Sequence, residues 1–192
     1  LQNLCRMPSV AARGSGMRAI AETVEQSMQR VGIGTRSFRV GSGYPIIYGE
    51  CGSGPKTFVV YGHYDVQPVG HLTEWASGPF AATIQHGKLY ARGAANGKGD
   101  LIARLAAVEA YQKTFGKLPV TLRFIVEGED GLGSPSLYRF TNENAELLKA
   151  DGCLWDEGSS DTKEQPVVSL GFKGITFLEL RAFGAHSDLH SK

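Results

Sequence analysis

Three apolar runs that each end in histidine or carboxylate residues constrain the fold of this chain most strongly. The runs cover residues 57–61, 120–126 and 153–155, and each is predicted to be a buried strand. They lead into Gly62-His63-Tyr64-Asp65, Glu127-Gly128-Glu129-Asp130 and Asp156-Glu157. In an open α/β sheet, ligands bind beyond the carboxyl ends of the strands. We therefore expect these polar residues to converge at one edge of a sheet and to form a site.

Helical patterns alternate with these strands. Helices are predicted over residues 17–31, where Gly32 and Gly34 offer a stop, over 101–115, and from Ser134-Pro135, with Ser134 as N-cap. A further short strand is expected at 45–49. Strands alternating with helices predict an α/β fold with a mainly parallel sheet flanked by helices.

The pattern changes near Gln165-Pro166. Residues 167–183 are predicted to be long strand material without an intervening helix. We therefore expect a first domain over residues 1–165 and the beginning of a second over 166–192. This beginning should expose apolar residues, namely Phe172, Ile175, Phe177 and Leu178. The chain does not begin with Met, which fits a processed chain or a piece of a longer one.

Composition excludes several classes of function. A net charge of +1 over 192 residues gives no reason to expect a nucleic acid or an anionic membrane as partner. No apolar run approaches the roughly 20 residues that span a bilayer, and no secretory signal is evident at the start. Cys5, Cys51 and Cys153 are odd in number and widely spaced. They are expected to be small buried hydrophobes in a reducing, cytoplasmic setting.

His63-x-Asp65 is a spacing that suits a metal ion. The imidazole supplies a neutral nitrogen ligand, and a carboxylate two residues on can orient the ring. The alternative is an ordinary turn at a strand end with solvated side chains. A metal site needs further ligands, and Asp156 and the acidic cluster at 127–130 are the available ones.

The segment Gly62-His63-Tyr64-Asp65-Val66-Gln67-Pro68 resembles the first metal-binding motif of metallopeptidase family M20. That family includes carnosine dipeptidases, glutamate carboxypeptidases, aminoacylases and succinyl-diaminopimelate desuccinylases. The resemblance continues through Trp75 to Phe80, Gly87 to Tyr90, Arg92-Gly93-Ala94, Glu127-Gly128 to Gly133-Ser134, Asp156, and Asp188-Leu189-His190-Ser191. It covers essentially the whole chain and is nearest the dipeptidase branch.

The resemblance implies a zinc-peptidase-like fold and a hydrolase. Residues 1–165 would be the N-terminal half of a catalytic domain, and 166–192 the start of an α+β lid or dimerisation domain, with a homodimer as one possible assembly. Two Zn²⁺ ions would share a bridging carboxylate and an activated water that attacks an amide carbonyl. The expected substrates are dipeptides or N-acyl-amino acids.

Carried over by position, the resemblance implies roles for six residues. His63 and Asp156 would be ligands of one metal, and Asp65 would orient His63. His190 would be the lid histidine that meets the substrate carbonyl. The general base falls at Asp130, one methylene shorter than the family's Glu. The bridging Asp falls at Asn96.

These departures leave alternatives open. An amide at Asn96 brings no charge to offset the repulsion between two dications, and Gly131 replaces a ligating Glu. We therefore expect none or one zinc in this chain. A catalytically impaired or non-catalytic relative, acting as a binding or dimerisation module, is the first alternative. A deacylase that needs one metal is another. Asn96-Gly97 itself is either a tight turn or a pair prone to deamidation.

Overall fold

The computed structural model describes residues 1–155, 159–160, 162–163, 165–171, 174, 176 and 178–184. The chain divides into two compact units, Leu1–Glu157 and Gly158–Lys192. The expected domain boundary between residues 165 and 166 stays a prediction. All of the secondary structure that positions the candidate site lies in the first unit.

A five-stranded mixed sheet forms the centre of the first unit. Its strands, in spatial order, are β1 (Gly34–Phe38), β2 (Ile46–Cys51), β6 (Thr121–Glu127), β3 (Thr57–His63) and β7 (Gly152–Leu154). β3 pairs in parallel with both β6 and β7, whereas β1, β2 and β6 pair antiparallel. The α/β class is confirmed, and the parallel strands β6, β3 and β7 are those predicted to carry the site. Strand β1 was not predicted.

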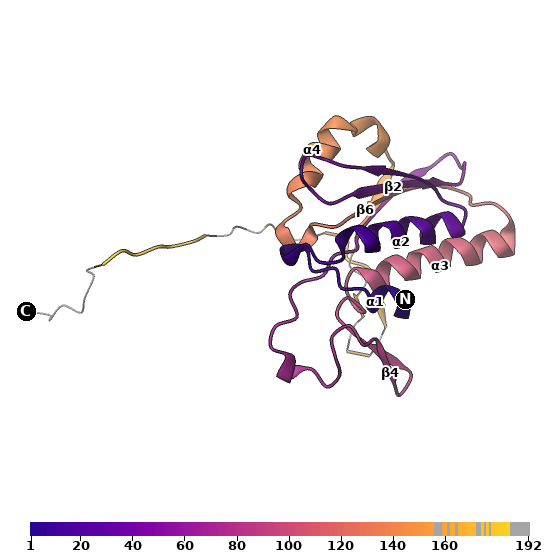
Figure 1. The fold of residues 1–192 in the computed structure, drawn as a ribbon. Coiled ribbons are helices and arrows are strands. Elements are labelled where there is room, and N and C mark those ends of the chain that lie inside the picture. Colours follow the sequence, from indigo (N-terminus) through magenta and orange to yellow (C-terminus); the bar gives the residue numbers. More distant parts are fainter. Residues whose placement is uncertain are drawn as a thin grey trace, which may run out of the picture. The chain divides into compact units, whose positions relative to one another are not determined.

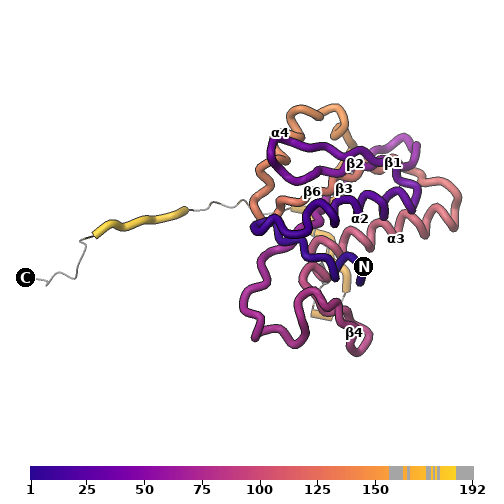
Figure 2. Tube along the Cα trace, viewed as in Figure 1, coloured from indigo at the N-terminus to yellow at the C-terminus, as the bar shows by residue number. Residues whose placement is uncertain are grey.

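Helices cover both faces of this sheet (Figures 1 and 2). The helices α2 (Met17–Arg30) and α3 (Lys98–Phe115) lie side by side on one face, and α4 (Pro135–Glu143) lies on the other. Alternate strand residues feed the two cores, as the two-residue period of a strand requires. Ile47 and Phe124 pack with α2 and α3, whereas Ile46, Tyr48 and Ile125 pack with Phe140 of α4.

Shorter elements complete the first unit. They are α1 (Gln2–Cys5), the 3-10 turns η1 (Ala11–Arg13), η2 (Leu72–Glu74), η3 (Asp130–Leu132) and η4 (Ala145–Leu148), and the hairpin of β4 (Thr83–Gln85) and β5 (Lys88–Tyr90). The hairpin extends away from the five-stranded sheet (Figure 2).

Three local predictions need correction. Helix α3 begins at Lys98 rather than at residue 101, because Gly97 turns the chain into the helix with φ 84°. Ser134 occupies the N-cap position of α4 but makes no side-chain cap, since its Oγ donates to Glu127 instead. The strand predicted at 153–155 is β7, and it is exposed rather than buried. Leu154 is 53% exposed there.

The cysteines only partly follow the prediction. Cys5 and Cys51 are buried, and Cys153 is exposed on β7. Burial raises the pKa of the Cys51 thiol to about 11, so this side chain stays a neutral thiol at physiological pH. No helix among the described residues is long and apolar enough to cross a membrane.

Within its described residues, the second unit has a short hairpin, formed by β8 (Ser159–Ser160) and β9 (Pro166–Val167). Beyond Val167, the described residues form no strand, so the prediction of long strand structure over 167–183 is wrong for them. Their apolar side chains are exposed, and Leu178 is 84% exposed. Phe172, Ile175 and Phe177, predicted to be exposed as well, lie outside the described residues.

Candidate active site

Four of the predicted site residues come together at the carboxyl ends of β3 and β6. His63 is the last residue of β3, and Asp65 follows two positions later. Asn96 lies in the turn that precedes α3, and Asp130 opens the 3-10 turn η3 after β6. The predicted site residues Asp156 and His190 lie outside the described residues. For His63, Asp65 and Asp130, convergence at one sheet edge follows from the parallel pairing of β3 with β6. Asn96 reaches them from the turn before α3, where its Oδ1 lies 3.1 Å from His63 Nε2.

The His63 ring is held at both nitrogens. Its Nδ1 lies 3.1 Å from the backbone oxygen of Asp65 and 3.2 Å from Asp65 Oδ1. Its Nε2 lies 3.1 Å from Asn96 Oδ1 and 3.8 Å from Asp130 Oδ2. Two acceptors at Nδ1 fix that nitrogen as the protonated one, so Nε2 is the nitrogen presented to the site.

Asp65 also organises the turn that carries Asp130. Its carboxylate is fully buried and accepts the backbone N–H of Asp130 at 3.3 Å and of Gly131 at 2.9 Å. One side chain therefore orients His63 and fixes the backbone at the general-base position. The resemblance predicts the first role, whereas the second depends on how β6 turns into η3.

Two glycines approach this cluster closely. A Cβ built on Gly97 would lie 2.7 Å from Cε1 of His63, and one on Gly131 would lie 3.1 Å from Asp65 Oδ2. Gly97 also has a positive φ, which L residues rarely adopt. Gly131 lacks that constraint. A side chain at position 131 thus needs only a small shift of Asp65, whereas one at 97 would displace the His63 ring.

Glu127 is a buried acid next to the site that sequence reasoning did not single out. It pairs with His63 across the β3–β6 ladder, and its Oε1 accepts hydrogen bonds from Tyr61 (2.6 Å) and Ser134 (2.5 Å). Its Oε2 has no partner in the described part of the chain. Burial raises the pKa of the Glu127 carboxyl. Its place directly after the apolar run 120–126 put it in the acidic cluster, but its burial follows from its pairing opposite His63 in the sheet.

Glu129 replaces the side-chain cap that Ser134 was expected to supply. Its carboxylate accepts the N–H of Ser136 at 3.0 Å, in the first turn of α4, and the N–H of Tyr44 at 3.3 Å. A negative charge at a helix N-terminus is favourable because it satisfies unpaired N–H groups and opposes the helix dipole. Glu129 thus connects α4 to the segment before β2.

Lys98 anchors the turn of Asn96 to the N-terminal segment. The side chain is fully buried, and its Nζ donates to the backbone oxygens of Leu4 at 3.0 Å and Met7 at 2.8 Å. The ammonium also lies 5.9 Å from the Phe80 ring centroid. Burial lowers the pKa of Lys98 to about 8. No sequence pattern signals this contact, because its partners are backbone atoms over 90 residues away.

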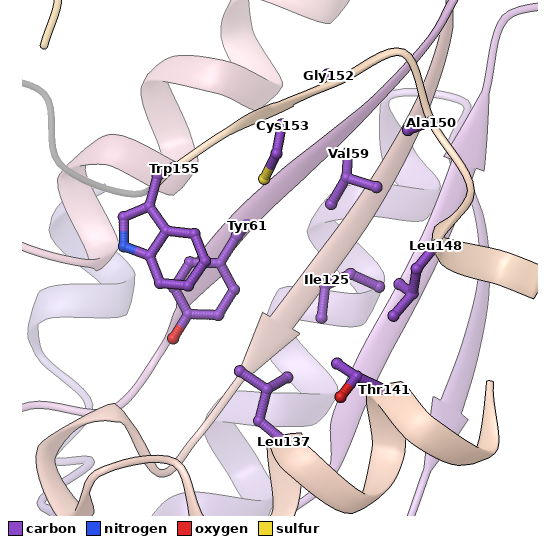
Figure 3. A pocket seen from close by; sticks show the side chains of 10 residues that line it. All are labelled: Val59, Tyr61, Ile125, Leu137, Thr141, Leu148, Ala150, Gly152, Cys153 and Trp155. Atoms are coloured by element: carbon purple, nitrogen blue, oxygen red, sulfur yellow. The ribbon is translucent and has the colours of Figure 1, made fainter. Parts of the chain in front are cut away.

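An apolar pocket of about 400 Å³ lies on the α4 face of the sheet (Figure 3). Trp155 stacks on Tyr61 with ring centroids 4.0 Å apart, and Leu137 and Thr141 of α4 close the opposite side. Tyr61 is the link to the candidate site, because its hydroxyl donates to Glu127. The Arg104 guanidinium donates to the backbone oxygens of Tyr61 and Trp155, at 2.7 and 2.6 Å.

The described side chains do not fit a two-zinc centre. Within the described ranges, no three His, Cys, Asp or Glu side chains are grouped so that they could hold a metal ion. The bridging position presents the neutral amide of Asn96 to His63. At the next expected ligand, Gly131 contributes only a backbone N–H, which donates to Asp65. The number of ions that the protein binds stays a prediction.

Comparisons with known proteins agree with the motifs. The chain is 35% identical over 153 residues to a Cys-Gly metallodipeptidase of Schizosaccharomyces pombe, covering 77% of this chain and 32% of that protein. It is 29% identical over 191 residues to a succinyl-diaminopimelate desuccinylase of Legionella pneumophila, covering 96% of this chain and 48% of the relative. The chain therefore spans between about a third and a half of the length of these relatives.

A solved structure has the same fold. An M20 family metallo-carboxypeptidase from Sulfolobus solfataricus superposes with a TM-score of 0.81 at 33% identity, over 85% of this chain and 37% of that one. The family model of peptidase family M20/M25/M40 matches residues 59–185, which include His63, Asp65, Asn96 and Asp130. This chain belongs to peptidase family M20/M25/M40.

Proposed function

We propose that this chain forms the N-terminal half of the catalytic domain of an amide hydrolase that cleaves dipeptides or N-acyl-amino acids. Its relatives include a Cys-Gly metallodipeptidase and a succinyl-diaminopimelate desuccinylase, which act on amide bonds of these two kinds. The observation that carries the proposal is the His63–Asp65 pair, with Nε2 presented toward positions 96 and 130. Family membership alone would not require that geometry.

In this proposal the site residues keep the roles that their positions imply. His63 and Asp156 are ligands, Asp65 orients His63, and Asp130 occupies the general-base position. His190 belongs to a lid that starts within residues 166–192 and also forms a homodimer. General-base catalysis depends first on reach. Asp130 is one methylene shorter than Glu, so activity should be well below that of relatives with Glu at this position.

A second candidate is a non-catalytic binding or dimerisation module. The observation that favours it is the pair of departures at Asn96 and Gly131, which remove one bridging and one terminal carboxylate. The protein would then keep the family's fold and binding cleft without hydrolysis. A one-metal deacylase is less well supported, because the described residues supply only His63 and Asp130 near one point.

The two candidate functions predict different results when the missing carboxylates of the site are restored. The test introduces Asn96→Asp, Asp130→Glu and Gly131→Glu together into the full-length protein that carries this chain. The triple variant is then assayed with zinc on Cys-Gly, β-Ala-His and N-succinyl-diaminopimelate. The hydrolase proposal predicts that zinc binding and cleavage of at least one substrate rise together. A repaired protein that binds zinc and cleaves none of them would overturn it and favour the binding module.

A control variant separates the length of the base from the loss of the other two carboxylates. Asp130→Glu alone restores the reach of the base without the missing carboxylates at positions 96 and 131. It should therefore bind no more zinc than wild type and gain less activity than the triple variant. The position of Gly131 supports the feasibility of the triple change, since a Cβ there meets only the ends of the Asp65 and Gln67 side chains.

A further inference from the structure

We propose that Asn96 is a site of spontaneous deamidation, in which the backbone nitrogen of Gly97 attacks the Asn96 side-chain amide. Conversion would place a carboxylate, or an isoaspartyl linkage, beside His63. The reaction needs only water, so this inference goes beyond the proposed hydrolase and does not depend on it.

The backbone at this position is open to the reaction. Asn96 is exposed in the turn before α3, and Gly97, which is itself buried, is the N-cap residue of that helix. The first N–H groups of a helix have no partner within the helix. Among the described residues, the structure gives the N–H of Gly97 no hydrogen-bond acceptor. Gly97 also has no side chain to obstruct ring closure and has wide backbone freedom.

The position of His63 explains why glycine follows Asn96 at this site. A Cβ at position 97 would lie 2.7 Å from Cε1 and 2.9 Å from Nε2 of the His63 ring. The packing of His63 therefore requires glycine after Asn96. Because Asn96 occupies the preceding position, the fold holds an Asn-Gly dipeptide against the ring.

The same ring faces the atom on which charge develops. His63 Nε2 lies 3.1 Å from Asn96 Oδ1. When the Gly97 nitrogen adds to Cγ, negative charge accumulates on that oxygen. Because the ring proton is on Nδ1, Nε2 presents a lone pair rather than a donor, so His63 fixes the need for glycine at position 97 but does not stabilise this charge. A tight turn alone explains the glycine, but it does not require the amide oxygen to face a ring nitrogen.

The reaction balances without a further reagent. The Gly97 N–Cγ bond forms, the Cγ–Nδ2 bond breaks, and ammonia leaves with the proton lost from the Gly97 nitrogen. The product is a cyclic imide. Water then adds at one of its two carbonyl carbons. Cleavage of the bond from nitrogen to Cγ gives aspartate at position 96 in a normal backbone, and cleavage of the bond from nitrogen to the backbone carbon gives isoaspartate.

The experiment uses the folded wild-type protein in mildly alkaline buffer prepared with heavy-oxygen water. Aliquots are digested with trypsin, which releases residues 93–98 as one peptide and 140–149 as another. The second peptide is a matched internal control. It contains Asn142, which is exposed like Asn96 but is followed by Glu143, and also Asn144, which is followed by Ala145. Fragment masses assign any conversion in this peptide to one of the two. We expect peptide 93–98 to acquire the mass of an amide-to-acid exchange with one heavy oxygen, and to be a substrate of isoaspartyl methyltransferase.

Conversion should be faster at Asn96 than at Asn142 by at least about tenfold, a difference of about 1.4 kcal/mol in barrier. Equal rates at the two sites would overturn the proposal, as would conversion of Asn96 that occurs only in denaturant. Asn96→Gln should show no change in mass at this peptide, which identifies the reacting amide. None of these readouts involves peptide hydrolysis, so failure of the hydrolase proposal would leave the result unaffected.

Discussion

Asp65 accepts hydrogen bonds from three groups at once, namely His63 Nδ1 and the backbone N–H groups of Asp130 and Gly131. The carboxylate is fully buried, so water cannot replace a lost partner. Bonds to a charged acceptor contribute more than neutral ones, and an unsatisfied buried donor is costly. The site's geometry therefore depends on this one side chain even without a bound ligand.

We predict that Asp65→Asn destabilises the protein by about 1.5–3 kcal/mol, because the amide NH₂ would face a backbone donor. Denaturant unfolding of the two proteins measures the difference. Glu22→Gln is the matched control, since it removes a carboxylate from an exposed ion pair with Arg18. That change should alter stability by less than about 1 kcal/mol. Equal effects of the two substitutions would show that Asp65 has no organising role.

The burial of Lys98 predicts how the stability of the protein depends on pH. Its pKa is lowered from 10.5 to about 8 by burial. Between these two values the unfolded chain binds more protons than the folded chain, so stability attributable to Lys98 should rise with pH. The full shift corresponds to at most about 3.4 kcal/mol.

The measurement is the free energy of unfolding of wild type and Lys98→Met across the window from about pH 8 to 10.5. The difference between the proteins isolates Lys98 from the other groups that titrate there. The free energy of unfolding of wild type, relative to that of the variant, should increase as pH rises. Lys98→Met should be less stable than wild type throughout, because the carbonyls of Leu4 and Met7 lose their donor. A difference that does not change with pH would contradict the assignment.

At the scale of elements, helix α4 starts with a cap supplied from the preceding turn. Glu129 accepts the N–H of Ser136, while the N-cap residue Ser134 donates to Glu127. The sequence pattern Ser134-Pro135 identified the start of the helix correctly but assigned the cap to the wrong side chain. Ser134 adopts a left-handed φ of 54°, which lets its hydroxyl reach Glu127 instead.

We predict that Glu129→Gln increases hydrogen exchange at the Ser136 amide and lowers stability by about 1 kcal/mol, the usual effect of losing a helix cap. Exchange measured by mass spectrometry or NMR reports the change directly. Glu143→Gln, at the other end of the same helix, removes only an exposed pair with Arg139 and should leave the Ser136 amide unchanged. Exchange that is equally slow in Glu129→Gln would mean that the cap lies elsewhere.

The strands and helices that could be predicted are those with a strong local pattern. Helix α2 has an unbroken apolar stripe, and β3 and β6 are apolar runs that end in polar residues. β1 was missed because it lies at the sheet edge, where its residues are mostly polar and mostly exposed. The sequence alone could not predict that Lys98 binds backbone oxygens of the N-terminal segment or that Glu127 is buried, since both depend on tertiary packing.

For the whole molecule, the positions where this chain differs from the family pattern say more about its activity than the positions where it agrees. His63, Asp65, Asn96 and Asp130 lie together. The convergence of His63, Asp65 and Asp130 could be predicted from the strand ends, whereas Asn96 was placed by the resemblance alone. The sequence could not predict the distances between these side chains or the extent to which each is buried, and both bear on function. Asn96 presents an amide to His63, and Gly131 gives its N–H to Asp65.

The most direct test of this account is the zinc content of the full-length protein that carries this chain, measured by elemental analysis after loading and desalting. Mass spectrometry of peptide 93–98 first confirms that position 96 is still Asn, because conversion to Asp would add a potential ligand. The account predicts fewer than two zinc ions for each wild-type chain, and a gain in the triple variant Asn96→Asp, Asp130→Glu, Gly131→Glu. Two tightly held zinc ions in wild type with Asn96 intact would contradict it.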